Sequence, residues 1–213
     1  MGAMADLYAA QRVSFPQLIV PPWLPATPGE SLGDYARRMA KAVDPGGPCV
    51  VGGTSFGGFV AVEMARLLNC RGCILISSAR SAARLPRRVR WLRLVSPVFA
   101  PWSYRFAVAA TPTISRVLKP FVRPAVTRFL RHVARSDAEF LRWATYATLR
   151  WRSDGECPVP IRHVHGGRDF TLPPRGVGAD EIIDGGGHLI VMTHAARVNA
   201  FVQRALVEFG ALR

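Results

Sequence analysis

Residues 49–58, Cys-Val-Val-Gly-Gly-Thr-Ser-Phe-Gly-Gly, are the most informative stretch of the chain. A short β-branched run leads into the pattern Gly-x-Ser-x-Gly at residues 53–57, and a helical repeat of apolar residues follows over 59–68. This is the order strand, tight turn, helix. A serine at the apex of such a turn has a strained backbone, so its neighbours must lack side chains to avoid clashes. The helix N-terminus, with its free N–H groups and partial positive charge, then points at the serine. The stretch therefore predicts a nucleophilic oxygen at Ser55 beside a place that can hold negative charge.

Two later stretches carry the other groups that a serine nucleophile needs. Residues 159–169 read Val-Pro-Ile-Arg-His-Val-His-Gly-Gly-Arg-Asp, and residues 181–188 read Glu-Ile-Ile-Asp-Gly-Gly-Gly-His. Together with the turn at Ser55, they resemble the α/β-hydrolase superfamily, which uses the chain order serine, acid, histidine. The resemblance covers about residues 15–80 and 157–209. It implies that Ser55 is the nucleophile, Asp169 the catalytic acid and His188 the base.

Each of these three residues also has a purely structural interpretation. The glycine-rich pattern can arise by chance in a chain with 19 glycines, Asp169 could cap a turn, and His188 could be a surface histidine. Asp184 is a rival acid, but it precedes the glycine turn, where it would end a strand. His163 and His165 are two residues apart and share one face of a strand, and we interpret His165 as structural.

The sequence shows no sign of a bound metal or cofactor. His194 falls within the last helical segment, where we expect a surface group. No set of histidines and cysteines has the spacing of metal ligands. We therefore expect no metal and no cofactor.

The chemistry that the resemblance implies is nucleophilic catalysis on a small-molecule acyl substrate. Ser55 becomes a nucleophile only when a base takes its proton, which an imidazole titrating near neutrality can do. Asp169 would hold His188 in one tautomer. The backbone N–H of Phe56 is the first donor implied for the oxyanion, and losing one such donor typically costs about 3 kcal/mol of transition-state stabilisation.

The second oxyanion donor is expected near the start of the chain. Gly2, Ala3 and Met4 resemble the family's glycine-rich oxyanion loop without the strand that should precede it, and the alternative is a disordered N-terminus. Residues 17–20 read as one strand, ended by prolines. We therefore expect an N-terminally short fold whose sheet begins near Gln17, lacks the family's early strands and leaves one edge open.

Two amphipathic helices are expected to flank the sheet. Ser31 opens a capping pattern and a helix through Val43. Apolar residues recur at helical spacing over 198–209 and form one stripe. Both patterns suit helices that pack on a sheet.

Composition indicates one globular α/β domain. The chain has 213 residues, of which 49% are hydrophobic, and no run of 18 apolar residues. The first residues lack the basic start and long apolar run of a signal peptide. The four cysteines do not form a disulfide framework pattern. We expect a cytoplasmic protein.

Positive charge is concentrated in residues 81–152, which hold 15 Lys and Arg against two acidic residues. This aromatic-rich segment interrupts the sheet pattern at the place where the family inserts a helical lid. A basic, apolar lid suits a lipid or acidic acyl substrate, or peripheral contact with an anionic membrane surface. The alternative is a general arginine bias, since the chain has 26 arginines and two lysines. No recognition motif supports nucleic-acid binding.

The sequence therefore predicts an α/β-hydrolase-like, mostly parallel sheet flanked by helices. Residues 1–80 and 153–213 would form the core, and residues 81–152 a basic helical lid. The expected function is a serine hydrolase for an ester or thioester. One alternative is a non-catalytic relative whose lid binds a membrane or a partner, and another is a C–C hydrolase or cofactor-free peroxidase with the same triad.

Overall fold

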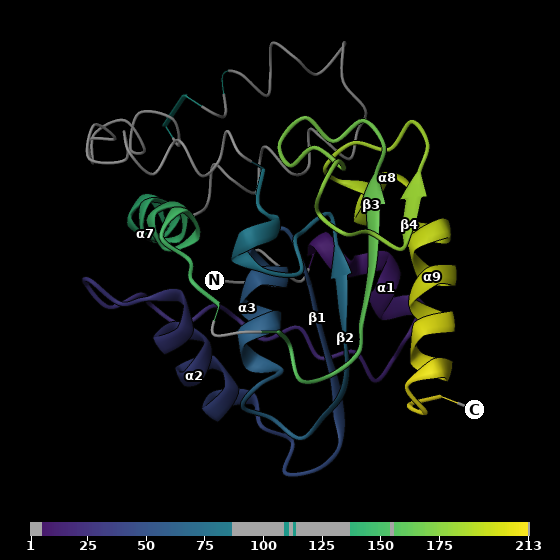
Figure 1. Ribbon diagram of the computed structural model, residues 1–213, viewed down its shortest axis with the longest axis horizontal. Helices are drawn as coiled ribbons and strands as arrows, with labels where there is room; N and C mark the ends of the chain where they lie inside the picture. The colour runs from purple at the N-terminus through teal and green to yellow at the C-terminus, as the bar shows by residue number, and fades with distance from the viewer. Residues whose placement is uncertain (1–5, 87–108, 111–112, 114–136, 154–155, 213) are drawn as a thin grey trace.

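The computed structural model describes residues 6–86, 109–110, 113, 137–153 and 156–212. The described strands form one parallel four-stranded sheet in the order β1 (Cys49–Thr54), β2 (Cys70–Ile76), β3 (Ile161–Gly166) and β4 (Glu181–Ile183). All four arrows in Figure 1 point the same way, so the carboxyl ends of the strands share one edge. Loops at that edge are where parallel sheets place their functional groups.

Helices cover both faces of this sheet (Figure 1). One face carries α2 (Leu32–Val43), α3 (Phe56–Met64) and α7 (Ala138–Leu149), and the other carries α1 (Ala9–Ser14), α8 (Ile190–Thr193) and α9 (Ala195–Glu208). A short 3-10 turn, η2, spans Ala82–Arg84. The result is a three-layer α/β fold, as the sequence predicts.

Alternation along β2 explains why both faces are apolar. Cys73 and Leu75 point into the cluster beneath α2 and α3, whereas Ile74 and Ile76 point into the cluster beneath α9. Successive side chains of a strand leave opposite faces, so a strand covered on both sides is apolar throughout. Because both clusters are closed by helices, the sheet is a rigid base for the loops at its carboxyl edge.

The two predicted amphipathic helices are confirmed. The Ser31 hydroxyl accepts a hydrogen bond from the Asp34 N–H at 3.1 Å and caps α2, which ends at Val43. The inner side of α2 buries Leu32, Tyr35 and Met39. The stripe over 198–209 lies on α9 and packs on the far face of the sheet.

The predicted strand at residues 17–20 is wrong, because this segment is irregular and the described sheet begins at Cys49. Pro16, Pro21 and Pro22 flank the segment and lack the N–H that a strand ladder needs. In the part of the chain that the structure covers, β1 has no strand on its outer side. There the Tyr8 hydroxyl, at 2.9 Å, accepts the N–H of Thr54.

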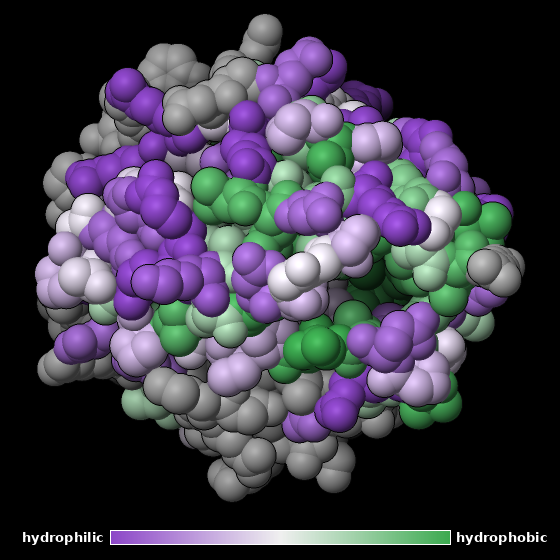
Figure 2. All heavy atoms as spheres, turned by 90° about the horizontal axis from the view of Figure 1, so that it is seen from below, coloured by the Kyte–Doolittle hydropathy of each residue, from purple (hydrophilic) through white to green (hydrophobic). Residues whose placement is uncertain are grey.

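Most of the predicted lid, residues 81–152, lies outside the described residues. Within the described part of that segment, η2 and α7 are helical, and α7 packs on α2 and α3. No described helix is long and apolar enough to cross a membrane. Figure 2 views the molecule from the end opposite the carboxyl edge, where hydrophobic and hydrophilic side chains are intermixed on the surface.

Candidate active site

Ser55 lies at the apex of the turn between β1 and α3. Its backbone has φ 54° and ψ −121°, a left-handed conformation that costs free energy for a non-glycine residue. A side chain at Gly53 would come within 2.3 Å of the Gly57 carbonyl group, so the turn requires glycine there. The Ser55 N–H donates to Ile76 of β2 at 3.1 Å, and the Ser78 hydroxyl donates to the Ser55 carbonyl at 2.9 Å. The strained turn is therefore tied to the neighbouring strand.

Asp169 lies in the loop that follows β3, and only 2% of it is exposed. Its Oδ1 accepts the backbone N–H groups of Thr171 at 2.9 Å and Leu172 at 2.8 Å. Burial alone would raise the pKa of Asp169, but hydrogen bonds from His165 and His188 outweigh it and hold that pKa below its usual range. The carboxylate is thus ionised and fixed in orientation.

His188 lies in the loop between β4 and α8. That loop rests on the Asp169 loop, since the Arg168 N–H donates to the Gly186 carbonyl at 2.7 Å. Gly166 has no room for a side chain, because a Cβ would lie 2.3 Å from the Gly187 carbonyl oxygen. Close backbone packing therefore sets the distance between the acid and the histidine.

The structure brings the three predicted residues together in the order Asp169, His188, Ser55. His188 Nδ1 lies 2.7 Å from Asp169 Oδ2, and His188 Nε2 lies 2.9 Å from Ser55 Oγ. A carboxylate can only accept, so the imidazole carries its proton on Nδ1 and presents a bare Nε2 to the serine hydroxyl. Such an arrangement can take a proton from Ser55 and return it to a leaving group.

The predicted oxyanion residues have different outcomes. Phe56 is the first residue of α3, and among the described residues its N–H meets no acceptor, as expected at a helix N-terminus. Gly2, Ala3 and Met4 lie outside the described residues, so their role stays a prediction.

The rival residues lie elsewhere or have other partners. Asp184 is exposed and is not part of the hydrogen-bonded set around Ser55. The ring of His194 lies 2.9 Å from the Thr193 hydroxyl at the start of α9. In the described part of the chain, no three His, Cys, Asp or Glu residues are placed to hold a metal ion.

An aromatic cluster surrounds Phe56 on the other side of Ser55. The ring centroid of Phe56 lies 5.5 Å from Trp23, 6.1 Å from Phe140 and 5.8 Å from Trp143. Tyr35 of α2 joins the cluster, with its ring 4.5 Å from Trp143. The cluster connects α7, at the end of the predicted lid, to the first residue after Ser55.

Sequence reasoning missed three contributions to this site. It gave no role to Ser78, whose hydroxyl holds the Ser55 carbonyl, or to Tyr8, which occupies the outer edge of β1. It treated His165 as structural, but its ring lies 3.1 Å from Asp169 Oδ2. The alternating histidines at 163 and 165 were the available signal, because two polar residues on one face of a buried strand need partners there.

Comparison with known proteins identifies the family. Residues 7–201 match the model of the "Alpha/beta hydrolase family", so the chain belongs to that family. It is 32% identical over 154 residues to an orsellinic acid synthase of Beauveria bassiana; the match covers 67% of this chain and 7% of that protein. The chain thus spans less than a tenth of the length of this curated relative.

Solved structures share the fold. A thermophilic esterase from Thermogutta terrifontis superimposes with a TM-score of 0.64 at 17% identity, over 96% of this chain and 85% of that one. The N-acyl homoserine lactonase AidH, solved with N-butanoyl homoserine, has a TM-score of 0.55 at 20% identity, over 86% and 72% of the two chains. At sequence identities this low, the similarity shows a shared fold alone.

Proposed function

We propose that the protein is a serine hydrolase that cleaves a carboxylic ester or thioester of a small-molecule acyl substrate through an acyl-enzyme. The observation that carries the proposal is the unbroken set of hydrogen bonds from Asp169 through His188 to Ser55, built on a strained turn. Backbone strain at the half-buried Ser55 supports a functional role, because strained backbone conformations cluster at active sites.

In the proposed mechanism, His188 Nε2 takes the Ser55 proton as Oγ attacks the carbonyl carbon of the substrate. The tetrahedral oxyanion forms at the N-terminus of α3, where the Phe56 N–H can donate to it. His188 then protonates the leaving group, and the acyl group stays on Ser55. A water molecule, activated by the same imidazole, releases the acid and restores the enzyme.

The two solved structures named above, an esterase and a lactonase, both concern ester bonds, since a lactone is an internal ester. The orsellinic acid synthase is a much longer protein, of which this chain spans a small part, so its name says little about the substrate of this chain. An ester or thioester is therefore the first class of substrate to test.

Labelling with a fluorophosphonate tests the proposal. The wild-type protein should be modified on Ser55 and should hydrolyse a short p-nitrophenyl ester, whereas Ser55→Ala should do neither while keeping its melting temperature. Ser81→Ala is the matched control, because the Ser81 side chain makes no cap hydrogen bond and lies outside the set around Ser55. Labelling of Ser55→Ala would refute the assignment. A folded wild type that neither labels nor hydrolyses any ester would favour the non-catalytic alternative.

A further inference from the structure

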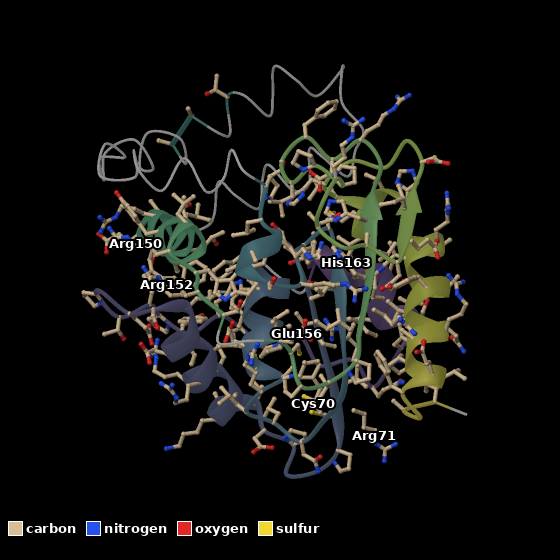
Figure 3. The ribbon with its side chains drawn as sticks, viewed as in Figure 1. Cys70, Arg71, Arg150, Arg152, Glu156 and His163 are labelled. Atoms are coloured by element: carbon tan, nitrogen blue, oxygen red, sulfur yellow. The ribbon has the colours of Figure 1, made fainter. Side chains whose placement is uncertain are left out.

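Two buried histidines stand behind Asp169 and have no part in the mechanism above. His163 and His165 leave the same face of β3, and both are completely buried. The His163 Nε2 atom lies 3.0 Å from His165 Nδ1. Figure 3 labels His163, which lies in the interior of the fold. Because the two rings face each other in a dry interior, only one of the two facing nitrogens can carry a proton.

The partners of His165 fix its proton on Nε2. That nitrogen lies 2.8 Å from the Leu172 carbonyl oxygen and 3.1 Å from Asp169 Oδ2. Both groups only accept hydrogen bonds, so the Nε2–H must serve them. A neutral His165 then has a bare Nδ1, which has to accept.

His163 supplies the donor that His165 needs. The two facing nitrogens, 3.0 Å apart, need one proton between them, so that proton belongs on His163 Nε2. Backbone groups of Gly178 and Val177 lie near the His163 ring, but Nδ1 makes no hydrogen bond of normal geometry with a described residue. The Ser78 N–H also points at this Nε2 and would favour a bare nitrogen there, but at 3.4 Å that contact is weaker than the 3.0 Å contact between the rings, which decides the proton.

The charged groups around His163 also favour its neutral form. Burial is the main cause that lowers the pKa of His163 to about 3; the positive charge of Arg80 adds to it, and backbone groups of Gly178 and Val177 oppose it. Asp180 accepts the backbone N–H of His163 at 2.7 Å and is paired with Arg80, so its charge is already compensated. The ring stays uncharged at neutral pH.

These assignments give five groups whose hydrogen bonds converge on Asp169 from two sides. His163 donates to His165, His165 donates to Asp169, His188 donates to the same carboxylate oxygen, and Ser55 donates to His188. With both oxygens of Asp169 occupied by donors, the carboxylate cannot rotate or accept a further proton without losing a hydrogen bond. His188 is thereby held with Nε2 bare toward the serine.

We propose that His165 and His163 are positioning residues for the reaction at Ser55. His165 holds Asp169 ionised and in one orientation, and His163 fixes the tautomer in which His165 can do so. The inference rests on the proposed function, because positioning has a catalytic effect only if Ser55 and His188 react. Its structural content, the direction of the hydrogen bonds, can be measured separately.

Paired substitutions separate positioning from packing. His165→Phe keeps a ring of similar shape without any hydrogen bond, and His165→Gln keeps an N–H near the position of Nε2 without the ring. If His165 positions Asp169, the phenylalanine variant should lose about tenfold in kcat with KM little changed, as when partners that orient metal-bound histidines are removed. The glutamine variant should recover most of that loss. If His165→Phe kept a higher kcat than His165→Gln, or if both variants lost kcat equally, His165 would contribute only to packing.

The pH profile gives a second readout. In His165→Phe the Asp169 carboxylate has one donor fewer and attracts the His188 proton more strongly. The acidic limb of the plot of kcat/KM against pH should therefore move to higher pH in His165→Phe. It should stay in place in His165→Gln. An unchanged limb in His165→Phe would contradict the proposal. If His165→Phe does not fold, His163→Phe and His163→Gln make the same comparison one step further from Asp169.

Nitrogen-15 spectra of the imidazoles in the wild-type protein distinguish failure of this inference from failure of the proposed function. We expect His165 protonated on Nε2 with a bare Nδ1, and His163 protonated on Nε2. A proton on His165 Nδ1 would overturn the inference whether or not the protein hydrolyses esters. The expected tautomers in a protein that never reacts with a fluorophosphonate would support the hydrogen-bond direction and refute the hydrolase.

Discussion

Ser55 lies between two regions of opposite character. On one side, the loops after β3 and β4 surround it with hydrogen bonds of 2.7–3.1 Å that involve Asp169, His165 and His188. On the other side, Phe56 lies in a cluster of aromatic rings with centroids 5.5–6.1 Å from its own. The first region is held by directional contacts and the second by contacts that depend on shape.

This difference predicts how each region tolerates change. A hydrogen-bonded chain has one arrangement of protons, so removing one member affects the others, and its loss is not additive. Aromatic packing is spread over many weak contacts, and neighbouring rings can readjust. Substitutions in the polar region should therefore affect activity most, and substitutions in the aromatic region should affect stability most.

The largest expected effect is on activity, in Asp169→Asn. The amide keeps the size of the side chain but can donate toward His188, which then presents the wrong tautomer to Ser55. We expect a loss of about 10⁴-fold in kcat, the size seen when a serine protease loses this carboxylate. Asp184→Asn is the matched control, because this nearby acid is exposed and outside the set. Steady-state kinetics on a simple ester measure both, and equal losses would mean that the acid is misassigned.

The next effect is a pH-dependent stability difference in His163→Gln. The pKa of His163 is about 3 when folded and near 6.5 when unfolded, so the unfolded chain binds the proton first as pH falls. The wild type should therefore lose up to about 1.4 kcal/mol of unfolding free energy per pH unit below pH 6.5 from this group. The glutamine variant lacks that loss. Urea unfolding at pH 7, 6, 5 and 4 measures the difference, and parallel curves for the two proteins would show that His163 is not buried neutral.

A moderate effect on stability is expected in the aromatic region. Trp143 contacts Tyr35 and Phe56 and donates its indole N–H to the Glu30 carbonyl at 3.0 Å. Trp143→Ala should cost about 2–3 kcal/mol of unfolding free energy, less than a fully buried aromatic, and Trp143→Phe about 1 kcal/mol. Activity of the folded variants should stay within about tenfold, a difference of 1.4 kcal/mol. A loss as large as that of Asp169→Asn would erase the distinction between the two regions.

More of the polar region than of the aromatic region could be predicted from the sequence. Ser55, Asp169 and His188 stand in short patterns with strict local requirements, such as Gly53 beside the turn and Gly166 beside the His188 loop. Local patterns of this kind can be read without knowing the fold. The capping serine and apolar spacing of α2 were equally local, and that helix was predicted with its end at Val43.

Other features depend on contacts between distant parts of the chain. The aromatic cluster joins Trp23, Phe56 and Phe140, which no sequence spacing connects. The strand expected at residues 17–20 had an apolar pattern, but flanking prolines prevented pairing. The hydrogen bond from Thr54 to Tyr8 spans 46 positions of the sequence, so nothing local indicated it.

The smallest predicted effect lies where the two regions meet, at Tyr8. Its hydroxyl accepts the Thr54 N–H at 2.9 Å, and both it and the Trp23 ring border Gly57, within 4.0 Å of where a Cβ on that glycine would lie. Tyr8→Phe leaves the N–H of Thr54 without its acceptor beside the strained serine, so we expect a loss of about 1–2 kcal/mol of unfolding free energy. Tyr146→Phe is the control on α7, where the ring stacks under Arg150. Because the Thr54 peptide adjoins Ser55, the Tyr8 variant should also lower kcat by a few fold, about 1 kcal/mol in barrier height. Urea unfolding and ester kinetics on the same samples test both effects. A stability loss without any change in kcat would mean that the edge of β1 supports the fold and leaves the geometry of the serine untouched.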